Sequence, residues 1–183
     1  MSKLFYVTGL NGSINNGLGK YLKDNNVFDD YIELNEEFNK LSFKDKLKII
    51  EDKLTNFKDI DFSIIAVSFG AYLILNKVLK GSYDNLKSVF LLSPVLGPVM
   101  LPSGGKIPPN FTSFKKLLSE NKSNVNFTIV YGTKDPICPQ ENLQLFIENI
   151  KNKEVFSLQN QTHSLEIKDV QYAINTFLEK EKN

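Results

Sequence analysis

The stretch Ile64–Tyr72 reads IIAVSFGAY and carries the strongest single signal for the fold. Four apolar residues run directly into Ser68, and Gly70 and Ala71 follow before an apolar helical pattern resumes. A short continuous apolar run is typical of a strand buried on both faces of a parallel sheet. The small residues around the serine indicate a tight turn from that strand into a helix.

On both sides of this stretch, short apolar runs alternate with segments of helical pattern. Short apolar runs predict six strands, and each is followed by a segment with helical spacing of its apolar residues. Strands and helices that alternate in this way indicate an α/β fold: a doubly wound, about six-stranded parallel sheet with helices on both faces. We expect one domain over residues 1–183, because no linker or repeat interrupts the pattern. The predicted strands are Leu4–Thr8, Tyr31–Leu34, Phe62–Val67, Val89–Leu92, Phe127–Tyr131 and Val155–Leu158.

Composition excludes several classes of function. The formal net charge is +1, so we expect neither a nucleic acid nor an acidic membrane surface as partner. No apolar run approaches the ~18 residues of a membrane helix, and the N-terminus lacks the apolar core of a signal peptide, so we expect a cytoplasmic protein. A single cysteine, Cys138, and a single histidine, His163, provide no zinc cluster.

The sequence also lacks the fingerprints of nucleotide cofactors. Gly9–Gly19 is rich in glycine after a strand, but it does not spell G-x-G-x-x-G, and no G-x-x-x-x-G-K-[ST] is present. We therefore expect no organic cofactor and no metal.

Ser68 occupies the centre of a pattern close to G-x-S-x-G, the strand–turn–helix known as a nucleophile elbow. The residues are Ala66-Val67-Ser68-Phe69-Gly70, in which alanine, still a small residue, replaces the first glycine. A serine in this position is presented at the carboxyl edge of the sheet. The pentapeptide by itself is equally compatible with an ordinary strand end followed by a helix-capping serine.

A serine nucleophile requires a base and an acid that orients the base. His163 is the sole candidate for the base, and it follows the last predicted strand. Asp135 is the candidate acid, since it follows the preceding strand, although the same sequence would also form a plain Asp-Pro turn. Glu166 lies close to His163 in sequence and stays open as a weaker alternative.

With Ser68, Asp135 and His163 in this order after parallel strands, the whole chain resembles a compact α/β-hydrolase. In size and layout it is similar to the small retinoblastoma-binding-protein-9-like serine hydrolases. The resemblance implies a Ser68–Asp135–His163 triad and an oxyanion hole made by the amides of Phe69 and of Leu10. Many relatives carry His-Gly where this chain has Thr8-Gly9, so Asn11 stays an alternative to Leu10 as the second donor.

The activity implied by this resemblance is acyl transfer to Ser68 and hydrolysis of the resulting ester. Without a large inserted cap, the expected substrates are small or short-chain carboxylic esters or thioesters. Residues 93–110 contain five of the seven prolines and could form a short lid or simply pack on the core. A silent binding protein with the same fold and an acyltransferase with the same triad are the alternatives. The sequence leaves the oligomeric state open.

Overall fold

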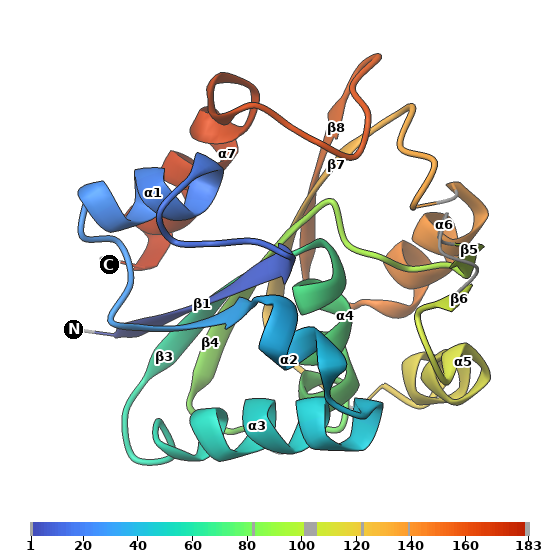
Figure 1. Cartoon of the computed structure of the whole chain (residues 1–183), viewed down its shortest axis with the longest axis horizontal. Helices are drawn as coiled ribbons and strands as arrows, with labels where there is room; N and C mark the ends of the chain where they lie inside the picture. The colour runs from blue at the N-terminus through green and yellow to red at the C-terminus, as the bar shows by residue number, and fades with distance from the viewer. Residues whose placement is uncertain (1, 82, 101–105, 122, 139, 182–183) are drawn as a thin grey trace.

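A six-stranded sheet forms the centre of the molecule, seen in the computed structural model in Figure 1. The structure describes residues 2–81, 83–100, 106–121, 123–138 and 140–181. The strand order is β2-β1-β3-β4-β7-β8, and every neighbouring pair is parallel. The predicted fold class is thereby confirmed. The strands are β1 (Lys3–Leu10), β2 (Asp30–Leu34), β3 (Phe62–Val67), β4 (Leu86–Leu92), β7 (Asn126–Gly132) and β8 (Lys153–Leu158).

Helices cover both faces of this sheet. One face packs against α1 (Gly17–Asp24) and α7 (Ile167–Glu181). The other face is covered by five helices, with α4 at the centre. These are α2 (Glu36–Lys40), α3 (Phe43–Thr55), α4 (Ser68–Val78), α5 (Phe111–Ser119) and α6 (Gln140–Asn149).

Alternation along the central strands divides the core into two layers. Phe5 and Val7 of β1 belong to the core cluster beneath α4, whereas Leu4 and Tyr6 belong to the cluster beneath α1 and α7. Successive side chains of a strand point to opposite faces, so a strand between two helical layers has to be apolar throughout. This is why the predicted strands read as continuous apolar runs.

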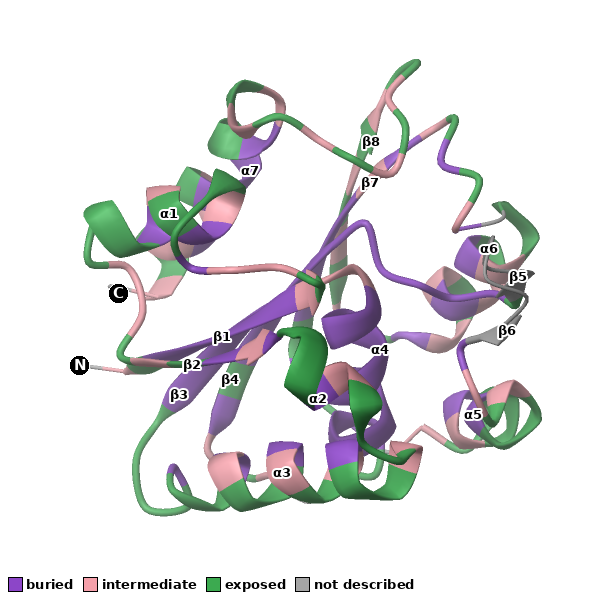
Figure 2. Ribbon diagram, in the orientation of Figure 1, coloured by how far each residue is buried: buried purple, intermediate pink, exposed green. Residues whose placement is uncertain are grey.

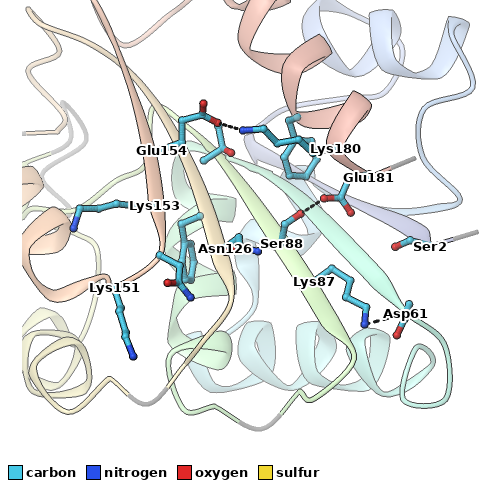
Figure 3. A pocket seen from close by; sticks show the side chains of 14 residues that line it. Ser2, Asp61, Lys87, Ser88, Asn126, Lys151, Lys153, Glu154, Lys180 and Glu181 are labelled. Carbon is cyan, nitrogen blue, oxygen red and sulfur yellow. Dashed lines mark hydrogen bonds and ion pairs between the residues drawn. The ribbon is translucent and has the colours of Figure 1, made fainter. Parts of the chain in front are cut away.

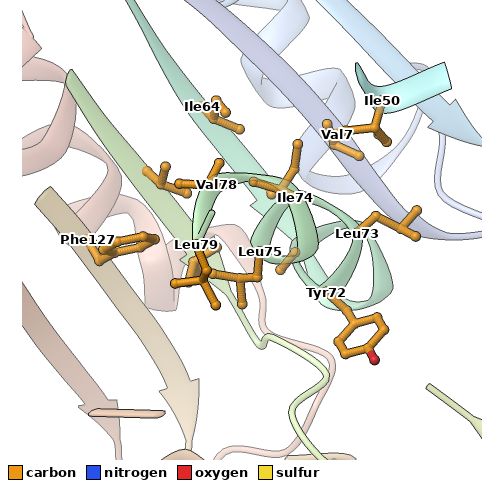
Figure 4. Close-up of a cluster of buried hydrophobic side chains, with 14 of the residues drawn as sticks. Val7, Ile50, Ile64, Tyr72, Leu73, Ile74, Leu75, Val78, Leu79 and Phe127 are labelled. Atoms are coloured by element: carbon orange, nitrogen blue, oxygen red, sulfur yellow. The ribbon is translucent and has the colours of Figure 1, made fainter. Parts of the chain in front are cut away.

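Helix α4 is the most deeply buried helix (Figure 2), and Figure 4 shows several of its apolar side chains within the core cluster. Every residue after Ser68 in this helix is buried, including Asn76 and Lys77. Lys77 Nζ remains satisfied through an ion pair of 2.9 Å with Glu51 of α3. A helix that is apolar on all sides is stable only when it is covered on all sides. The residue that begins this helix is therefore held rigidly.

The structure adds detail at the ends of the predicted elements. Most strands extend one to three residues beyond the predicted runs, and α4 begins at Ser68 instead of at Tyr72. Helix α2 was not predicted, because its five residues bury only Phe38 and show no apolar period. Ser42 caps α3, since its Oγ accepts the Asp45 N–H at 3.1 Å.

Candidate active site

Ser68 lies at the junction of β3 and α4. Strand β3 ends at Val67, and the helix begins at the serine itself. The backbone of Ser68 has φ 51°, in the left-handed region that residues other than glycine seldom adopt. Strain of this kind persists where the surrounding structure enforces it, and it is concentrated at functional sites. The turn presents the serine side chain at the carboxyl edge of the sheet.

The small residues beside Ser68 have a steric cause. A Cβ atom added to Gly70 would lie 2.2 Å from the carbonyl oxygen of Thr8, and one added to Gly9 would lie 3.1 Å from the Ser68 Cβ. The end of β1 therefore packs directly on the elbow, with no room for a methyl group at Gly70. The pattern of small residues in the sequence reflects this close approach of two backbone segments.

Gly70→Ala is expected to destabilise the fold by about 3 kcal/mol, the upper part of the usual range for overpacking. The contact involves a backbone carbonyl, which cannot rotate away as a flexible side chain would. Chemical denaturation of the variant and of the wild-type protein measures this difference. Gly17→Ala is a contrasting variant: its added Cβ meets nothing within 4 Å, but the φ of +49° strains an alanine, so it reports backbone strain without overpacking, the reverse of Gly70→Ala.

His163 and Asp135 continue from Ser68 as one hydrogen-bonded chain. The Ser68 Oγ lies 2.8 Å from the His163 Nε2, and the His163 Nδ1 lies 2.8 Å from the Asp135 Oδ2. The structure thus brings together the three residues that the sequence singled out. In this geometry the imidazole can take the proton of the hydroxyl while the hydroxyl oxygen attacks a carbonyl, and the carboxylate orients the imidazole.

Asp135 is held by its own loop as well as by the histidine. Its side chain is fully buried, and the Oδ1 atom accepts the backbone N–H groups of Ile137 at 2.8 Å and Cys138 at 3.2 Å. The carboxylate therefore has a defined orientation, with Oδ2 left for His163. The Asp-Pro turn that the sequence suggested exists, and it serves to orient this carboxylate.

The loops that carry Asp135 and His163 are joined by backbone contacts. The N–H of Lys134 donates to the carbonyl of Gln161 at 2.9 Å. A Cβ atom on Gly132 would lie 2.3 Å from that same carbonyl oxygen. Since the two loops follow neighbouring strands β7 and β8, their separation is set by the sheet.

Cys138 lies in the Asp135 loop but is chemically shielded. Burial, and secondarily the nearby Asp135 carboxylate, raises the pKa of its thiol to about 12. Because the thiolate is the reactive form, we expect less than about 1% thiolate at pH 8 and no alkylation by iodoacetamide in the native protein. Mass spectrometry before and after unfolding in guanidinium checks this. Rapid labelling of the folded protein would contradict the burial of the thiol.

The end of β1 and the loop that follows it lie close to Ser68, because Gly9 packs against the serine side chain. Leu10 is 37% exposed at the end of β1, and the N–H of Asn11 donates to the carbonyl of Leu34 at 2.8 Å. Phe69 is the second residue of α4, so its amide belongs to the first turn, where N–H groups lack intrahelical partners. Phe69 directly follows Ser68, and Gly9, the residue before Leu10, packs against the Ser68 side chain, whereas the role of the Phe69 and Leu10 amides stays a prediction.

The proline-rich segment at 93–110 runs from the end of β4 to α5. Its first part packs on the core: Val95 and Leu96 are buried, and the Val95 N–H donates to the carbonyl of Ser68 at 3.2 Å. Its last part is tied to α4 by the Tyr72 hydroxyl, which donates to the Pro109 carbonyl at 2.7 Å. Two short antiparallel strands, β5 (Val99–Met100) and β6 (Lys106–Ile107), lie between them. Residues 101–105 of the predicted lid lie outside the described residues.

A hollow of about 940 Å³ lies at the opposite edge of the sheet (Figure 3). It is bordered by the first residues of β4, β7 and β8 and by the end of α7. Two ion pairs, Lys87–Asp61 and Lys180–Glu154, occupy its rim. It contains none of the predicted catalytic residues, because those follow the carboxyl ends of the strands.

Two further features concern metals and membranes. Over the part of the chain that the structure describes, no three His, Cys, Asp or Glu side chains gather as a metal site would require. No described helix combines the length and the apolar character needed to cross a bilayer.

Solved structures with the same architecture are α/β-hydrolases. Est1E from Butyrivibrio proteoclasticus is 14% identical, with a TM-score of 0.74 over 98% of this chain and 87% of its own. A monoacylglycerol lipase of Paleococcus ferrophilus is 16% identical (TM-score 0.70; 96% and 93% covered), and an Oenococcus oeni PSU-1 hydrolase is 14% identical (TM-score 0.73; 100% and 94%). No protein-family model and no curated protein matches the sequence. The chain therefore adopts the α/β-hydrolase fold.

Proposed function

We propose that this protein is a serine hydrolase that cleaves small or short-chain carboxylic esters or thioesters through an acyl-enzyme on Ser68. The observation that carries the proposal is the hydrogen-bonded chain from Ser68 through His163 to the buried Asp135, with 2.8 Å at each step. The left-handed backbone of Ser68 supports it, since an ordinary helix cap needs no such strain.

In the proposed reaction, Ser68 attacks the substrate carbonyl while His163 Nε2 takes the hydroxyl proton. A carboxylate only accepts hydrogen bonds, so Asp135 keeps the other imidazole proton on Nδ1 and leaves Nε2 free as the base. His163 then protonates the leaving alcohol or thiol. Water, deprotonated by the same nitrogen, releases the acid and restores Ser68.

The oxyanion of the tetrahedral intermediate would be bound by the amides of Phe69 and Leu10. Between Leu10 and Asn11, the contacts favour Leu10, because the Asn11 N–H is already engaged by the Leu34 carbonyl. Removal of one such donor typically costs ~2.7–4 kcal/mol of transition-state stabilisation.

The proposed substrate class rests on the similar solved structures and on the shortness of the proline-rich segment 93–110. Est1E is an esterase by name and has been solved with ferulic acid bound, and another neighbour is a monoacylglycerol lipase. Their names support hydrolysis of carboxylic esters as the reaction class here. The preference for small or short-chain substrates stays a prediction. The same holds for the likeness to the retinoblastoma-binding-protein-9-like group, for the cytoplasmic location and for the lack of nucleic-acid or membrane partners.

A panel of p-nitrophenyl esters from acetate to laurate, with an acyl thioester alongside, tests the proposal. We expect turnover that falls as the acyl chain lengthens, together with labelling of Ser68 by a fluorophosphonate, located by mass spectrometry. Folded protein that neither turns over any ester nor forms an adduct at millimolar probe would make it a silent binding protein. Products analysed with an alcohol or amine competing against water distinguish a hydrolase from an acyltransferase.

A further inference from the structure

Asn39 lies in α2, outside every segment that the sequence associated with catalysis, yet its side chain reaches the loop after β1. Its Nδ2 donates to the Asn11 Oδ1 at 2.8 Å and to the carbonyl of Leu34 at 2.9 Å. One amide group therefore joins α2, the end of β2 and the loop that follows β1. Asn11 is the residue directly after Leu10.

Leu34 is the centre of this set of contacts. Its carbonyl also accepts the Asn11 N–H at 2.8 Å, and its own N–H donates to the Thr8 Oγ1 at 2.9 Å. The buried Thr8 hydroxyl in turn donates to the Gly9 carbonyl at 3.1 Å. Both ends of the segment from Thr8 to Asn11 are thus held from the β2–α2 side, while Gly9 packs against Ser68.

The orientation of the Asn39 amide follows from its neighbours. The Leu34 carbonyl can only accept, so the Asn39 amide must present its nitrogen to it, and the Asn11 side chain then presents its Oδ1 to the same nitrogen. Its Oδ1 atom is buried and, among the described residues, has no hydrogen-bond partner. The cost of this unsatisfied buried oxygen offsets part of the stability that the two donated hydrogen bonds contribute.

Helix α2 is itself anchored so that this amide has a defined place. The Lys46 ammonium of α3 donates to the carbonyls of Asn39 and Leu41, at 2.9 Å for Asn39. At the other end of the helix, the Asn35 side chain accepts the Phe38 N–H at 3.0 Å. A five-residue helix is not stable by itself, and these contacts replace the missing length.

We propose that Asn39 is a positioning residue: it holds Asn11, and through it the Leu10 amide, at the distance from Ser68 that an oxyanion requires. This inference rests on the proposed function, because it assigns the Leu10 amide to transition-state binding. Asn39 touches no reacting atom. Its effect is expected in kcat, since the oxyanion forms only after the substrate has bound.

Kinetics of Asn39→Ala against Asn35→Ala separate positioning from simple support of α2. Both variants weaken the same helix, but only the first loses the contact with Asn11. We expect kcat to fall about 10- to 100-fold in Asn39→Ala with KM nearly unchanged, as a small misplacement of a catalytic group allows. Asn35→Ala should stay within threefold of wild type. Equal losses in both variants, or none in Asn39→Ala, would overturn the proposal.

A double-mutant cycle with Asn11→Gly tests the path through Asn11. Glycine removes the side-chain acceptor but tolerates the left-handed backbone of this residue, φ 57°. In the Asn11→Gly background, Asn39→Ala should lower kcat by a smaller factor than in wild type, because one of its two contacts is already lost. Independent, fully additive effects on kcat would contradict the proposed path.

Amide hydrogen exchange measured by NMR provides a readout that does not need turnover. In Asn39→Ala the Asn11 N–H, bonded to Leu34, should exchange at least tenfold faster than in wild type, while the Ile65 N–H in the core strand should not change. Unaltered exchange at Asn11 would refute the positioning role even in a protein without esterase activity. Faster exchange at Asn11 in Asn39→Ala, combined with a wild-type protein that hydrolyses no ester, would support the role of Asn39 in holding Asn11. That combination would refute only the proposed function.

Discussion

Replacement of Ser68 with alanine is expected to reduce ester hydrolysis by about 10⁶-fold, the loss typical when the nucleophile of such a triad is removed. Without the hydroxyl, His163 has no proton to take from the enzyme, and only water can attack. The fold should persist, because the Ser68 side chain does not cap α4 and the helix is stabilised by the burial of its other residues. Alanine keeps the small volume that the contact with Gly9 demands.

Steady-state hydrolysis of p-nitrophenyl acetate, with fluorophosphonate labelling in parallel, measures the effect of Ser68→Ala. The matched control is Ser164→Ala, an exposed serine next to His163, which should retain full activity and full labelling. Ser68→Ala with more than about 1% of wild-type activity would show that another group is the nucleophile.

Asp135→Asn is expected to lower kcat by about 10⁴-fold, because the imidazole would adopt the wrong tautomer. The backbone N–H groups of Ile137 and Cys138 need an acceptor, so the amide oxygen of the new asparagine should take the place of Oδ1. Its NH₂ group would then face the His163 Nδ1. That nitrogen must accept, so the proton moves to Nε2, which would donate to Ser68 instead of accepting its proton.

Kinetics of Asp135→Asn beside Glu166→Gln test this assignment of the acid. Glu166 is exposed and pairs with Lys168 at 2.6 Å, so its loss should change activity less than twofold. Thermal unfolding should show both variants folded, since Asp135→Asn retains an acceptor for both backbone amides. A large loss in Glu166→Gln with little in Asp135→Asn would transfer the orienting role to Glu166.

Much of the architecture could be read from local pattern. Strands buried on both faces leave continuous apolar runs, which is why Phe62–Val67 was predicted with its exact limits. Ends of strands were less accurate, because polar residues such as Asn126 and Lys153 pair in the ladder at the rim of the sheet. Helix α2 escaped prediction, since its stability comes from Lys46 and Asn35 and not from an apolar stripe.

The candidate catalytic residues could be named from the sequence because few alternatives existed. One histidine, one serine at an elbow-like turn and one acid after the preceding strand formed a short set. The sequence contained no comparable signal for Asn39 or for the Thr8 hydroxyl. Both are ordinary polar residues with a distant partner: Asn39 bonds Asn11, 28 residues away along the chain, and Thr8 bonds Leu34, 26 residues away.

The amino-acid sequence by itself determined the parallel α/β arrangement and the chemical identity of the candidate site, because periodicity and residue type are local properties. The tertiary structure decided the geometry: the 2.8 Å steps from Ser68 to Asp135, the bond that engages the Asn11 N–H with Leu34, and the support of that loop by α2. Those features depend on how loops from separate strands meet at one edge of the sheet. Only packing sets such distances, since no single segment contains both partners.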